Sequence, residues 1–430
     1  MLTPNITVND GHLFFGGADC VKLAQEHGTP LYVMDETMIR ENCRGYRDVI
    51  EAEYGGRGLI CFASKALSCK ELYRIVDSEG LGADVISGGE LYTALQAGMP
   101  AEKLVMHGNS KSNDELRFAI KENVGRIVAD NLPELARIEK IAAEMGKTVR
   151  VLLRIKPGID AHTHDFVRTG QIDSKFGFAL ETGEAMEAVK AASAYAHISL
   201  AGLHCHIGSQ ILDTDPFAEA ARVMLHFMND VRKELGITFT DLNLGGGPGI
   251  RYTEEDDPKP FGEIVRAILT ALKAACAECS YPEPFVLFEP GRSIVGGAGL
   301  TLYTVMARKT IPNIRTYVLV DGGMCDNPRY ALYHSRYEAI VANRAGQPRS
   351  ESVTIGGKCC ESGDLIGEAM PLQHAEPDDI LAVLATGAYN YSMASNYNRN
   401  PRAEMVMVKD GAARTVIRRE SYEDIVRNDI

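Results

Sequence analysis

The chain has 430 residues, of which 45% are hydrophobic and 24% charged, and its formal net charge is −13 at pH 7. This composition is typical of a globular protein with a large core, and the negative charge argues against nucleic acid or an anionic membrane as a partner. No apolar run reaches the roughly 18 residues of a membrane span. The N-terminus lacks a basic segment followed by an apolar one, so we expect no signal peptide.

Ten cysteines are spread along the chain without the spacing of a disulfide framework. Cys276 and Cys279 form a C-x-x-C motif, but no second pair lies at the spacing of a zinc ribbon. We therefore expect reduced thiols, most of them in the core, and a cytoplasmic location for the protein.

Short apolar runs typical of strands recur along the first two thirds of the chain, and most gaps between them show a helical pattern. The expected strands cover residues 58–64, 82–87, 103–108, 126–130, 149–156, 200–208, 241–247 and 284–291. Eight strands alternating with helices over about 240 residues predict a parallel (β/α)8 TIM barrel rather than a doubly wound open sheet. The first helix after a barrel strand is expected to be capped by Ser68, which precedes Glu71 in the spacing of a capping box.

The two ends of the chain predict a second domain. One β-hairpin is expected around Asp10–Gly11 and another around Asp410–Gly411, since Asp-Gly favours a tight hairpin turn. The last third of the chain contains several β-runs and few helical patterns. We therefore expect a barrel at residues 26–285, and a mostly antiparallel β-sandwich or barrel-like domain at residues 286–430 that is completed by an N-terminal hairpin within residues 1–25.

Side chains that follow the strands of such a barrel gather at its C-terminal face, where active sites lie. Glycine-rich loops after the seventh and eighth strands favour a phosphate site, because glycine lets backbone N–H groups approach an anion closely. An arginine in the eighth loop adds positive charge to this site. The residues expected at this face are Lys65, Asp84, Arg154, His206, Gly208, Ser209, Gly245–Gly247 and Glu289–Arg292.

Lys65 is the single charged side chain between a predicted buried strand and the predicted start of the next helix. A lysine amine whose pKa is lowered by burial can act as a nucleophile toward a carbonyl carbon. Such an amine beside a phosphate site suggests pyridoxal 5′-phosphate, with Glu289 paired to its pyridine nitrogen and His206 stacked on its ring. A solvated lysine, a helix cap at Glu289 and an ordinary strand-end histidine remain the alternatives at this point.

A zinc hydrolase is the competing interpretation of the same strand ends. His204 and His206 lie on one face of the sixth strand, and His162 and His164 repeat this spacing. Few strand-end carboxylates are left to complete a zinc site, and such a site would leave the glycine loops without a role. We therefore expect no metal.

Nine motifs follow one another between about residue 25 and residue 400: FASKAL, GADVISGGEL, HTHDFVRTGQIDSKFGF, GLHCHIGSQ, LNLGGGPGI, EPGRSIVGGAG, GGMCDNPRYALY, CESGDLI and GAYNYSMASNYN. In this order they resemble the diaminopimelate decarboxylases, which belong with ornithine decarboxylase to the barrel-type (fold type III) pyridoxal phosphate-dependent decarboxylases. The resemblance implies decarboxylation of meso-2,6-diaminopimelate to L-lysine and CO2, the last step of lysine biosynthesis. A related decarboxylase acting on ornithine, arginine or a D-amino acid is the alternative.

The resemblance also implies roles for individual residues. Lys65 would carry the cofactor covalently and, with His206 and Cys360, form the catalytic set. The remaining cofactor contacts would hold its phosphate, its ring and its pyridine nitrogen. The implied cofactor-binding residues are Lys65, Asp84, Arg154, His206, Ser209, Gly247, Glu289, Gly291, Arg292 and Tyr389.

Diaminopimelate carries a second carboxylate and a second ammonium group at the end remote from the reacting carbon. The resemblance implies that this end meets Arg292, Arg329, Tyr333, Glu361 and Tyr389. Paired arginines favour diaminopimelate over ornithine, because ornithine has no distal carboxylate for them to bind. Cys360 would protonate the α-carbon. Cys360 and Glu361 would come from the partner subunit of a homodimer with a shared active site.

Overall fold

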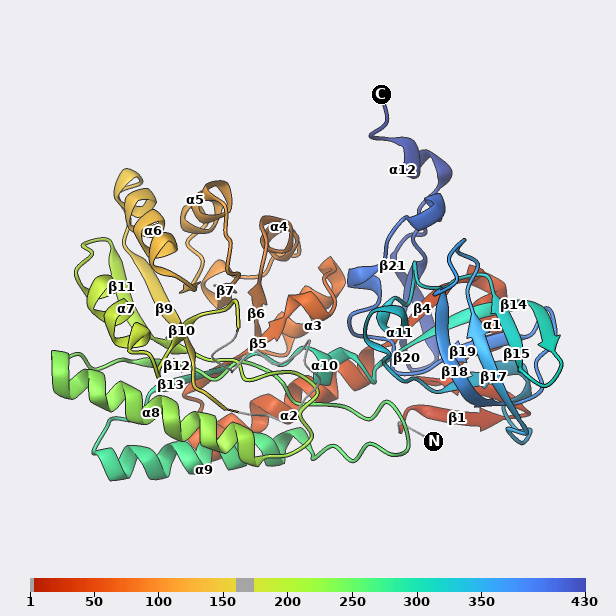
Figure 1. Cartoon of the computed structure of the whole chain (residues 1–430), viewed down its shortest axis with the longest axis horizontal. Coiled ribbons are helices and arrows are strands. Elements are labelled where there is room, and N and C mark those ends of the chain that lie inside the picture. Colours follow the sequence, from red (N-terminus) through yellow and green to blue (C-terminus); the bar gives the residue numbers. More distant parts are fainter. Residues whose placement is uncertain (1–3, 160–173) are drawn as a thin grey trace. The chain divides into compact units, whose positions relative to one another are not determined.

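The computed structural model describes residues 4–159 and 174–430 (Figure 1). By its backbone contacts the chain divides into two compact units. The first, which we call the barrel unit, comprises Asn42–Gly249 and Pro258–Ser293. The second, which we call the β unit, comprises Met1–Glu41, Ile250–Asp257 and Ile294–Ile430.

Parallel strands close into the predicted barrel in the barrel unit. In barrel order they are β5 (Gly58–Ala63), β6 (Gly82–Val85), β7 (Leu104–Met106), β8 (Arg126–Ala129), β9 (Val149–Lys156), β11 (Ile198–His204), β12 (Asp241–Asn243) and β13 (Phe285–Phe288). The ring is closed because β13 pairs in parallel with β5, with Leu287 opposite Leu59. The short β10 (Phe178–Ala179) pairs with the end of β9.

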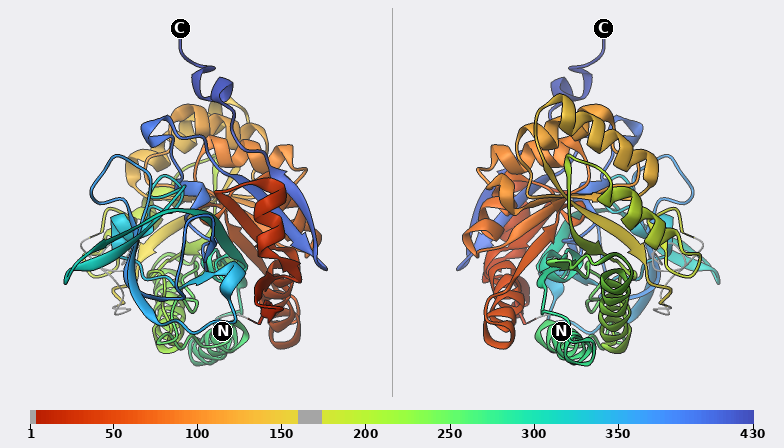
Figure 2. Two further views of the ribbon diagram at one scale, coloured as in Figure 1. Left: turned by 90° about the vertical axis from the view of Figure 1, so that its right-hand side faces the viewer. Right: turned by 90° about the vertical axis from the view of Figure 1, so that its left-hand side faces the viewer.

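Helices surround the barrel strands (Figure 2). They are α2 (Glu36–Tyr54), α3 (Lys70–Ser78), α4 (Gly88–Gln96), α5 (Asn113–Lys121), α6 (Leu132–Glu144), α7 (Glu184–Ser193), α8 (Asp215–Leu235) and α9 (Phe261–Cys279). Polar caps begin several of them, for example Ser112, which forms a capping box with Glu115 at the start of α5. Inward-facing side chains from several strands, including Val105, Leu152 and Leu287, form the barrel core.

The predicted cap at Ser68 is wrong. A one-turn helix, η1 (Ser64–Ala66), follows β5, and the chain then runs extended through Leu67 before α3 begins at Lys70. Cys69 therefore occupies the N-cap position and makes no side-chain cap bond. The Ser68 hydroxyl instead lies 3.0 Å from the Tyr73 hydroxyl.

A nine-stranded sheet forms the β unit and is mostly antiparallel, as predicted. Its main path runs β18 (Leu365–Leu372), β17 (Glu351–Gly356), β15 (Arg315–Val320), β14 (Gly299–Ile311), β4 (Leu31–Asp35), β20 (Glu404–Lys409) and β21 (Ala412–Ile417). The strands β16 (Ala339–Val341) and β19 (Ile380–Val383) pair off this path. The pairs β15–β17 and β20–β4 are parallel.

The predicted N-terminal hairpin consists of β1 (Ile6–Asn9) and β2 (His12–Phe15). With β3 (Ala18–Asp19) it makes a three-stranded sheet of its own and does not extend the large sheet. It is held to the β unit by side-chain packing, because Leu13 and Phe15 share a buried cluster with residues of the large sheet.

The strand β4 enters the large sheet, although it lies inside the range 26–285 that was expected for the barrel. It pairs with β14 on one side and with β20 on the other, so both of its edges are satisfied within the β unit. The expected domain ranges, residues 26–285 and residues 1–25 with 286–430, remain predictions.

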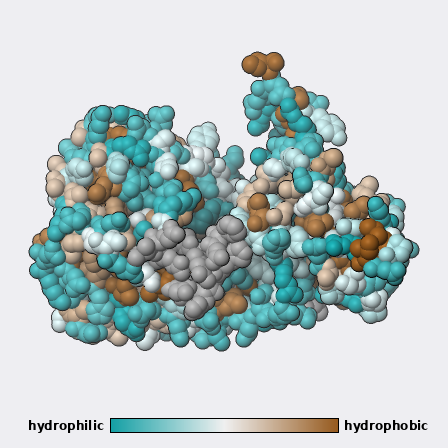
Figure 3. All heavy atoms as spheres, viewed as in Figure 1, coloured by the Kyte–Doolittle hydropathy of each residue, from teal (hydrophilic) through white to brown (hydrophobic). Residues whose placement is uncertain are grey.

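The molecular face drawn in Figure 3 is mostly hydrophilic, with hydrophobic residues scattered over it. Some large exposed apolar side chains lie on separate elements, such as Tyr92 on α4 and Met306 on β14, whereas Tyr422 and Val426 share the short helix α12 (Tyr422–Val426). Among the described residues, no helix is both long and apolar enough to cross a membrane.

Candidate active site

The C-terminal ends of the barrel strands surround a pocket of about 320 Å³. Lys65 lies in η1, directly after β5, and lines this pocket together with the predicted residues Arg154, His206 and Glu289. The full lining is Lys65, Ile86, His107, Gly108, Asn109, Arg154, Lys175, Phe176, His204, His206 and Glu289. These four predicted residues therefore share one cavity, whereas the predicted Asp84, Ser209, Gly247, Gly291 and Arg292 are not among its lining residues.

Asp84, which lies in β6, is the acidic neighbour of Lys65. Its Oδ2 atom lies 3.8 Å from the Lys65 Nζ atom, and its side chain is buried. Burial raises the pKa of Asp84, and the nearby Lys65 amine acts in the opposite direction. The Oδ1 atom of Asp84 has no hydrogen-bond partner within the described chain. Asp84 is therefore placed to attract the Lys65 amine toward the barrel.

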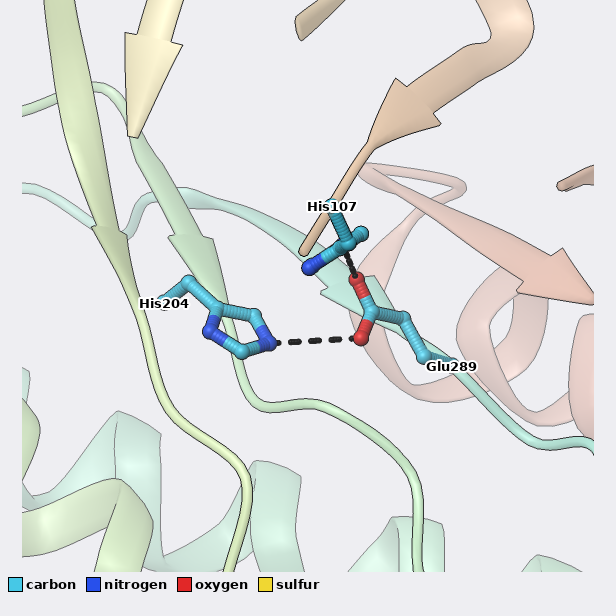
Figure 4. A group of neighbouring side chains, drawn as sticks. All are labelled: His107, His204 and Glu289. Atoms are coloured by element: carbon cyan, nitrogen blue, oxygen red, sulfur yellow. Dashed lines mark hydrogen bonds and ion pairs between the residues drawn. The ribbon is translucent and has the colours of Figure 1, made fainter. Parts of the chain in front are cut away.

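The Glu289 carboxylate follows β13 and is held by three donors, of which Figure 4 shows His107 and His204. Its Oε1 atom lies 2.6 Å from His107 Nε2 and 2.5 Å from Asn243 Nδ2, and its Oε2 atom lies 3.2 Å from His204 Nε2. Burial raises the pKa of Glu289, but His107 and the hydrogen bonds from His107 and His204 outweigh it, so this pKa lies well below the usual value. Glu289 therefore presents an ionised carboxylate to the pocket.

His107 and Asn243 are site residues that the sequence analysis missed. His107 directly follows β7, and Asn243 is the last residue of β12. Each occupies the strand-end position that identified Lys65 and His206, so the same rule applied to every strand would have found them. Asn243 also accepts a hydrogen bond at 2.9 Å from the backbone N–H of Gly245, which ties the glycine loop to Glu289.

His206 follows β11 and is half-buried at the pocket. Burial and the positive charges of Lys65 and Arg154 lower its pKa well below the usual value for histidine. A neutral imidazole results, which suits contact with a flat ring better than it suits an ion pair. Arg154 is fixed nearby with its guanidinium carbon 4.3 Å from the centroid of the Phe176 ring.

The loops after β12 and β13 pack so closely that they require glycine. A Cβ atom at Gly246 would lie 2.0 Å from the carbonyl oxygen of Glu289. At Gly247, where φ is +126°, it would lie 2.7 Å from the carbonyl oxygen of Gly208. At Gly291 it would lie 2.8 Å from the Cβ atom of Ala63. Glycine is therefore required at these positions by close packing against Glu289, Gly208 and Ala63.

Arg292 and Ser209 join these glycine loops through their side chains. Arg292 donates from Nη2 and Nε to the Ser209 Oγ atom, at 3.0 and 3.3 Å. The backbone N–H of Ile211, two residues after Ser209, donates to the Gly247 carbonyl at 3.1 Å. Ser209, Gly247 and Arg292 thus form a connected cluster in the barrel unit.

Arg329, Tyr333 and Tyr389 gather in the β unit. Arg329 begins the short helix α11 (Arg329–Tyr333), and only 8% of it is exposed. Its guanidinium carbon lies 5.3 Å from the ring centroid of Tyr333 and 5.5 Å from that of Tyr389. Nη2 donates to the Ser335 hydroxyl at 3.2 Å, whereas Nε has no partner among the described atoms.

Cys360 and Glu361 lie between β17 and β18 and are both exposed. All ten cysteines are free, and the other nine are buried or half-buried. The backbone N–H of Cys360 donates to Asn398 Oδ1 at 2.7 Å, which fixes the start of the turn. The neighbouring Cys359 is buried, as expected for a core thiol.

The histidines of the zinc interpretation do not pair as expected. In the described part of the chain, His204 groups with His107 and Glu289, whose ligand atoms all lie within 4.8 Å of one another. Both histidine Nε2 atoms of this group are already within hydrogen-bond distance of the Glu289 carboxylate. His162 and His164 lie outside the described residues.

Comparison with known proteins assigns the family. Residues 37–296 match the family described as pyridoxal-dependent decarboxylase, pyridoxal binding domain. The chain is 48% identical over 420 residues to the diaminopimelate decarboxylase of Bacillus subtilis (strain 168), an alignment that covers 98% of this chain and 95% of the relative. The chain belongs to the diaminopimelate decarboxylase family. It is therefore a pyridoxal phosphate-dependent carboxy-lyase.

Solved structures agree with this family assignment. The crystal structure of diaminopimelate decarboxylase from M. jannaschii in complex with L-lysine matches with a TM-score of 0.93 and 36% identity, over 100% of this chain and 99% of that chain. The Helicobacter pylori diaminopimelate decarboxylase complexed with L-lysine matches with a TM-score of 0.86 and 33% identity, over 94% and 98% of the two chains. A lysine/ornithine decarboxylase from Vibrio vulnificus, at 22% identity and a TM-score of 0.76, shares the fold.

The residues of the barrel unit fit the cofactor of the diaminopimelate decarboxylase family. A lysine amine reaches the pocket from η1, and an ionised carboxylate lines the same pocket. The guanidinium of Arg292 and the hydroxyl of Ser209, which hydrogen-bond to each other, are donors that suit an anion. An amine, an anion site and a carboxylate are the three groups that the aldehyde, the phosphate and the pyridine nitrogen of pyridoxal phosphate need.

Proposed function

We propose that this member of the diaminopimelate decarboxylase family removes CO2 from meso-2,6-diaminopimelate and releases L-lysine, the last step of lysine biosynthesis. The observation that carries the substrate assignment is the buried Arg329 guanidinium, whose Nε atom has no hydrogen-bond partner among the described residues. A buried cation requires an anionic partner, because its desolvation is otherwise uncompensated. The distal carboxylate of diaminopimelate supplies that partner.

Pyridoxal phosphate, when bound, supplies a ring that accepts the electron pair left by the departing carboxylate. Lys65 holds the cofactor covalently, and Asp84 keeps the Lys65 amine in place. His206 would contact the cofactor ring, and Glu289 would hold a proton on its pyridine nitrogen. The remaining cofactor contacts are Arg154, Ser209, Gly247, Gly291, Arg292 and Tyr389.

Substrate orientation follows from charge. Arg329 binds the distal carboxylate, since a guanidinium matches a carboxylate with two parallel hydrogen bonds. Tyr333 and Tyr389 flank Arg329 and limit its motion, which favours one orientation of the substrate. Glu361 of the partner subunit binds the distal ammonium group.

Cys360 of the partner subunit gives the α-carbon the proton that replaces the lost carboxyl group. This role fits the exposure of Cys360 on its own chain, because a residue that serves a neighbouring subunit must be accessible there. The functional unit is therefore a homodimer with a shared active site. We place it in the cytoplasm, where ten free thiols stay reduced.

Steady-state assays with diaminopimelate, ornithine, arginine and a D-amino acid test this function. The wild-type protein is expected to turn over diaminopimelate and none of the others at a comparable rate. The variant Arg329→Gln should lose about 100-fold or more in kcat/KM, because it removes a buried hydrogen bond between two charged groups.

The matched control is Arg399→Gln, which removes an exposed arginine of the same unit that pairs with Asp429. It should leave kcat/KM within about twofold of wild type, since exposed ion pairs contribute little. Robust turnover of ornithine together with no turnover of diaminopimelate would refute the proposed substrate and favour the ornithine alternative.

A further inference from the structure

Glu289 is surrounded by donors that come from three different barrel strands. We propose that His107 and His204 are positioning residues that hold the Glu289 carboxylate ionised and directed into the pocket, and thereby keep the pyridine nitrogen of the bound cofactor protonated. This inference rests on the proposed function, because it requires the cofactor ring to meet Glu289.

The geometry is that of a carboxylate held from two sides (Figure 4). His107 Nε2 lies 2.6 Å from Oε1, and His204 Nε2 lies 3.2 Å from Oε2. The three side chains are buried, with exposures of 6% for His107, 1% for His204 and 5% for Glu289. The two imidazole rings also contact each other edge to face, with centroids 4.8 Å apart. Each ring therefore limits the rotation of the other and of the carboxylate.

The protonation state of His204 follows from its surroundings. Its Nδ1 atom is buried and has no hydrogen-bond partner in the described chain. A doubly protonated ring would bury an N–H group at Nδ1 without an acceptor, which is unfavourable. Burial lowers the pKa of His204 to about 3, which agrees with this geometry. His204 is thus a neutral ring that carries its hydrogen on Nε2 and donates it to Glu289.

The Glu289 carboxylate has room for one more hydrogen-bond donor. An ionised carboxylate has about four lone-pair sites. His107, His204 and Asn243 occupy three of them. Glu289 also lines the pocket, so a fourth donor can reach it from there. The protonated nitrogen of a pyridine ring is a donor of this kind.

Glu289 would be prone to accept a proton without these donors. It is buried, and Asp84 brings a second acidic group to the same region. Cys61 and Cys205 add no charge, because burial raises the pKa of both thiols, that of Cys205 to about 12. The titratable and charged groups that face Glu289 are Cys61, Lys65, Asp84, His107, Arg154, His204, Cys205 and His206.

The test compares variants with and without a donor at the same place. In His107→Leu and His204→Leu the donor is lost, whereas in His107→Gln and His204→Gln an amide N–H can replace the Nε2–H group. The matched control is His197→Leu, which breaks a histidine–glutamate pair of the same unit outside the pocket, with His197 Nδ1 2.9 Å from Glu139 Oε1.

The readout is the 15N NMR signal of pyridoxal phosphate labelled at its ring nitrogen, recorded on holoenzyme in which attachment to Lys65 has first been shown by mass spectrometry. We expect a protonated nitrogen in wild type, in both Gln variants and in the control. In both Leu variants we expect a shift toward the unprotonated nitrogen. In both Leu variants we also expect kcat to fall about tenfold or more, while KM for diaminopimelate stays within about twofold of the wild-type value.

Leu variants with a fully protonated nitrogen would overturn the inference while leaving the proposed function intact. Wild-type protein without cofactor on Lys65 would overturn both. If a Leu variant does not fold, as judged by circular dichroism, His107→Ala or His204→Ala takes its place. A protonated nitrogen in the folded Ala variant contradicts the inference, and an unprotonated one supports it.

Discussion

Glu90 shows how a single residue at the barrel mouth responds to its surroundings. It lies in the first turn of α4, and its Oε2 atom accepts a hydrogen bond at 2.7 Å from the backbone N–H of Ile86. Burial raises its pKa to about 7, with a further rise from Asp84 that the Ile86 hydrogen bond and the Lys65 charge oppose. Ionisation of Glu90 therefore occurs close to neutral pH.

This raised pKa predicts a pH-dependent stability. The protonated form of Glu90 is favoured by folding, so its contribution is complete below the unfolded-state pKa of about 4.5 and is lost as the pH rises through about 7. In Glu90→Gln the group cannot ionise. We expect the variant to gain about 1–2 kcal/mol in stability relative to wild type between pH 5 and pH 8, as measured by unfolding in denaturant.

The matched control for this prediction is Glu187→Gln on the exposed face of α7. The difference in stability between Glu187→Gln and wild type should stay constant between pH 5 and pH 8. A constant difference between Glu90→Gln and wild type from pH 5 to pH 8 would show that Glu90 keeps an ordinary pKa.

Strand-end position predicted Lys65, Arg154, His206 and Glu289 as neighbours because a parallel barrel brings its strand ends to one face. The sequence could not predict the hydrogen bonds of Glu289. Its partner His107 lies 182 residues away along the chain, and no local pattern connects the two. Such a contact is set by the register of the barrel strands and by side-chain packing, which a single sequence does not encode locally.

At the scale of elements, the loop after β12 depends on backbone angles that favour glycine. Gly245 and Gly247 both have positive φ, and a side chain at Gly247 would also meet the Gly208 carbonyl. We expect Gly247→Ala to weaken pyridoxal phosphate binding about tenfold or more, because the loop must shift to accommodate the methyl group. Titration of cofactor-free protein, followed by absorbance, measures this.

Gly236→Ala provides the comparison for Gly247. Gly236 caps α8 with φ of +71°, and a Cβ atom there would meet nothing within 4 Å. This variant should lose stability from backbone strain but bind cofactor as wild type does. Equal cofactor affinity in Gly247→Ala and wild type would contradict the phosphate role of the loop.

The elements themselves were largely predictable from the sequence. Short apolar runs bounded by turn residues gave the barrel strands, and both Asp-Gly pairs turn as expected, with φ of 50° and 82° at Asp10–Gly11. The N-cap of α3 was wrongly predicted at Ser68, because nothing in the sequence indicated the one-turn helix η1, which occupies three residues after β5. No strand was expected at residues 31–35, where β4 joins the large sheet.

At the scale of the whole molecule, the shared active site predicts complementation between two inactive variants. Lys65→Ala and Cys360→Ala are each expected to be inactive as homodimers. When they are mixed and exchange subunits at random, half of the dimers are mixed, and each mixed dimer has one intact site. The mixture should therefore recover up to about a quarter of wild-type activity per site.

The control mixture combines Lys65→Ala with the double variant Lys65→Ala/Cys360→Ala, and it should stay inactive. Subunit exchange is confirmed by co-purification of two differently tagged chains. No recovery in the first mixture despite proven exchange would show that Lys65 and Cys360 act within one chain. The sequence alone could not test this arrangement, because subunit pairing depends on surfaces brought together by the fold.

The most direct test of the account is where pyridoxal phosphate attaches. Holoenzyme reduced with borohydride, digested and mapped by mass spectrometry should carry the adduct on Lys65. No adduct should appear on Lys175, the other lysine that lines the pocket, or in the Lys65→Ala variant. An adduct on Lys175, or no adduct on Lys65 in active enzyme, would contradict the account.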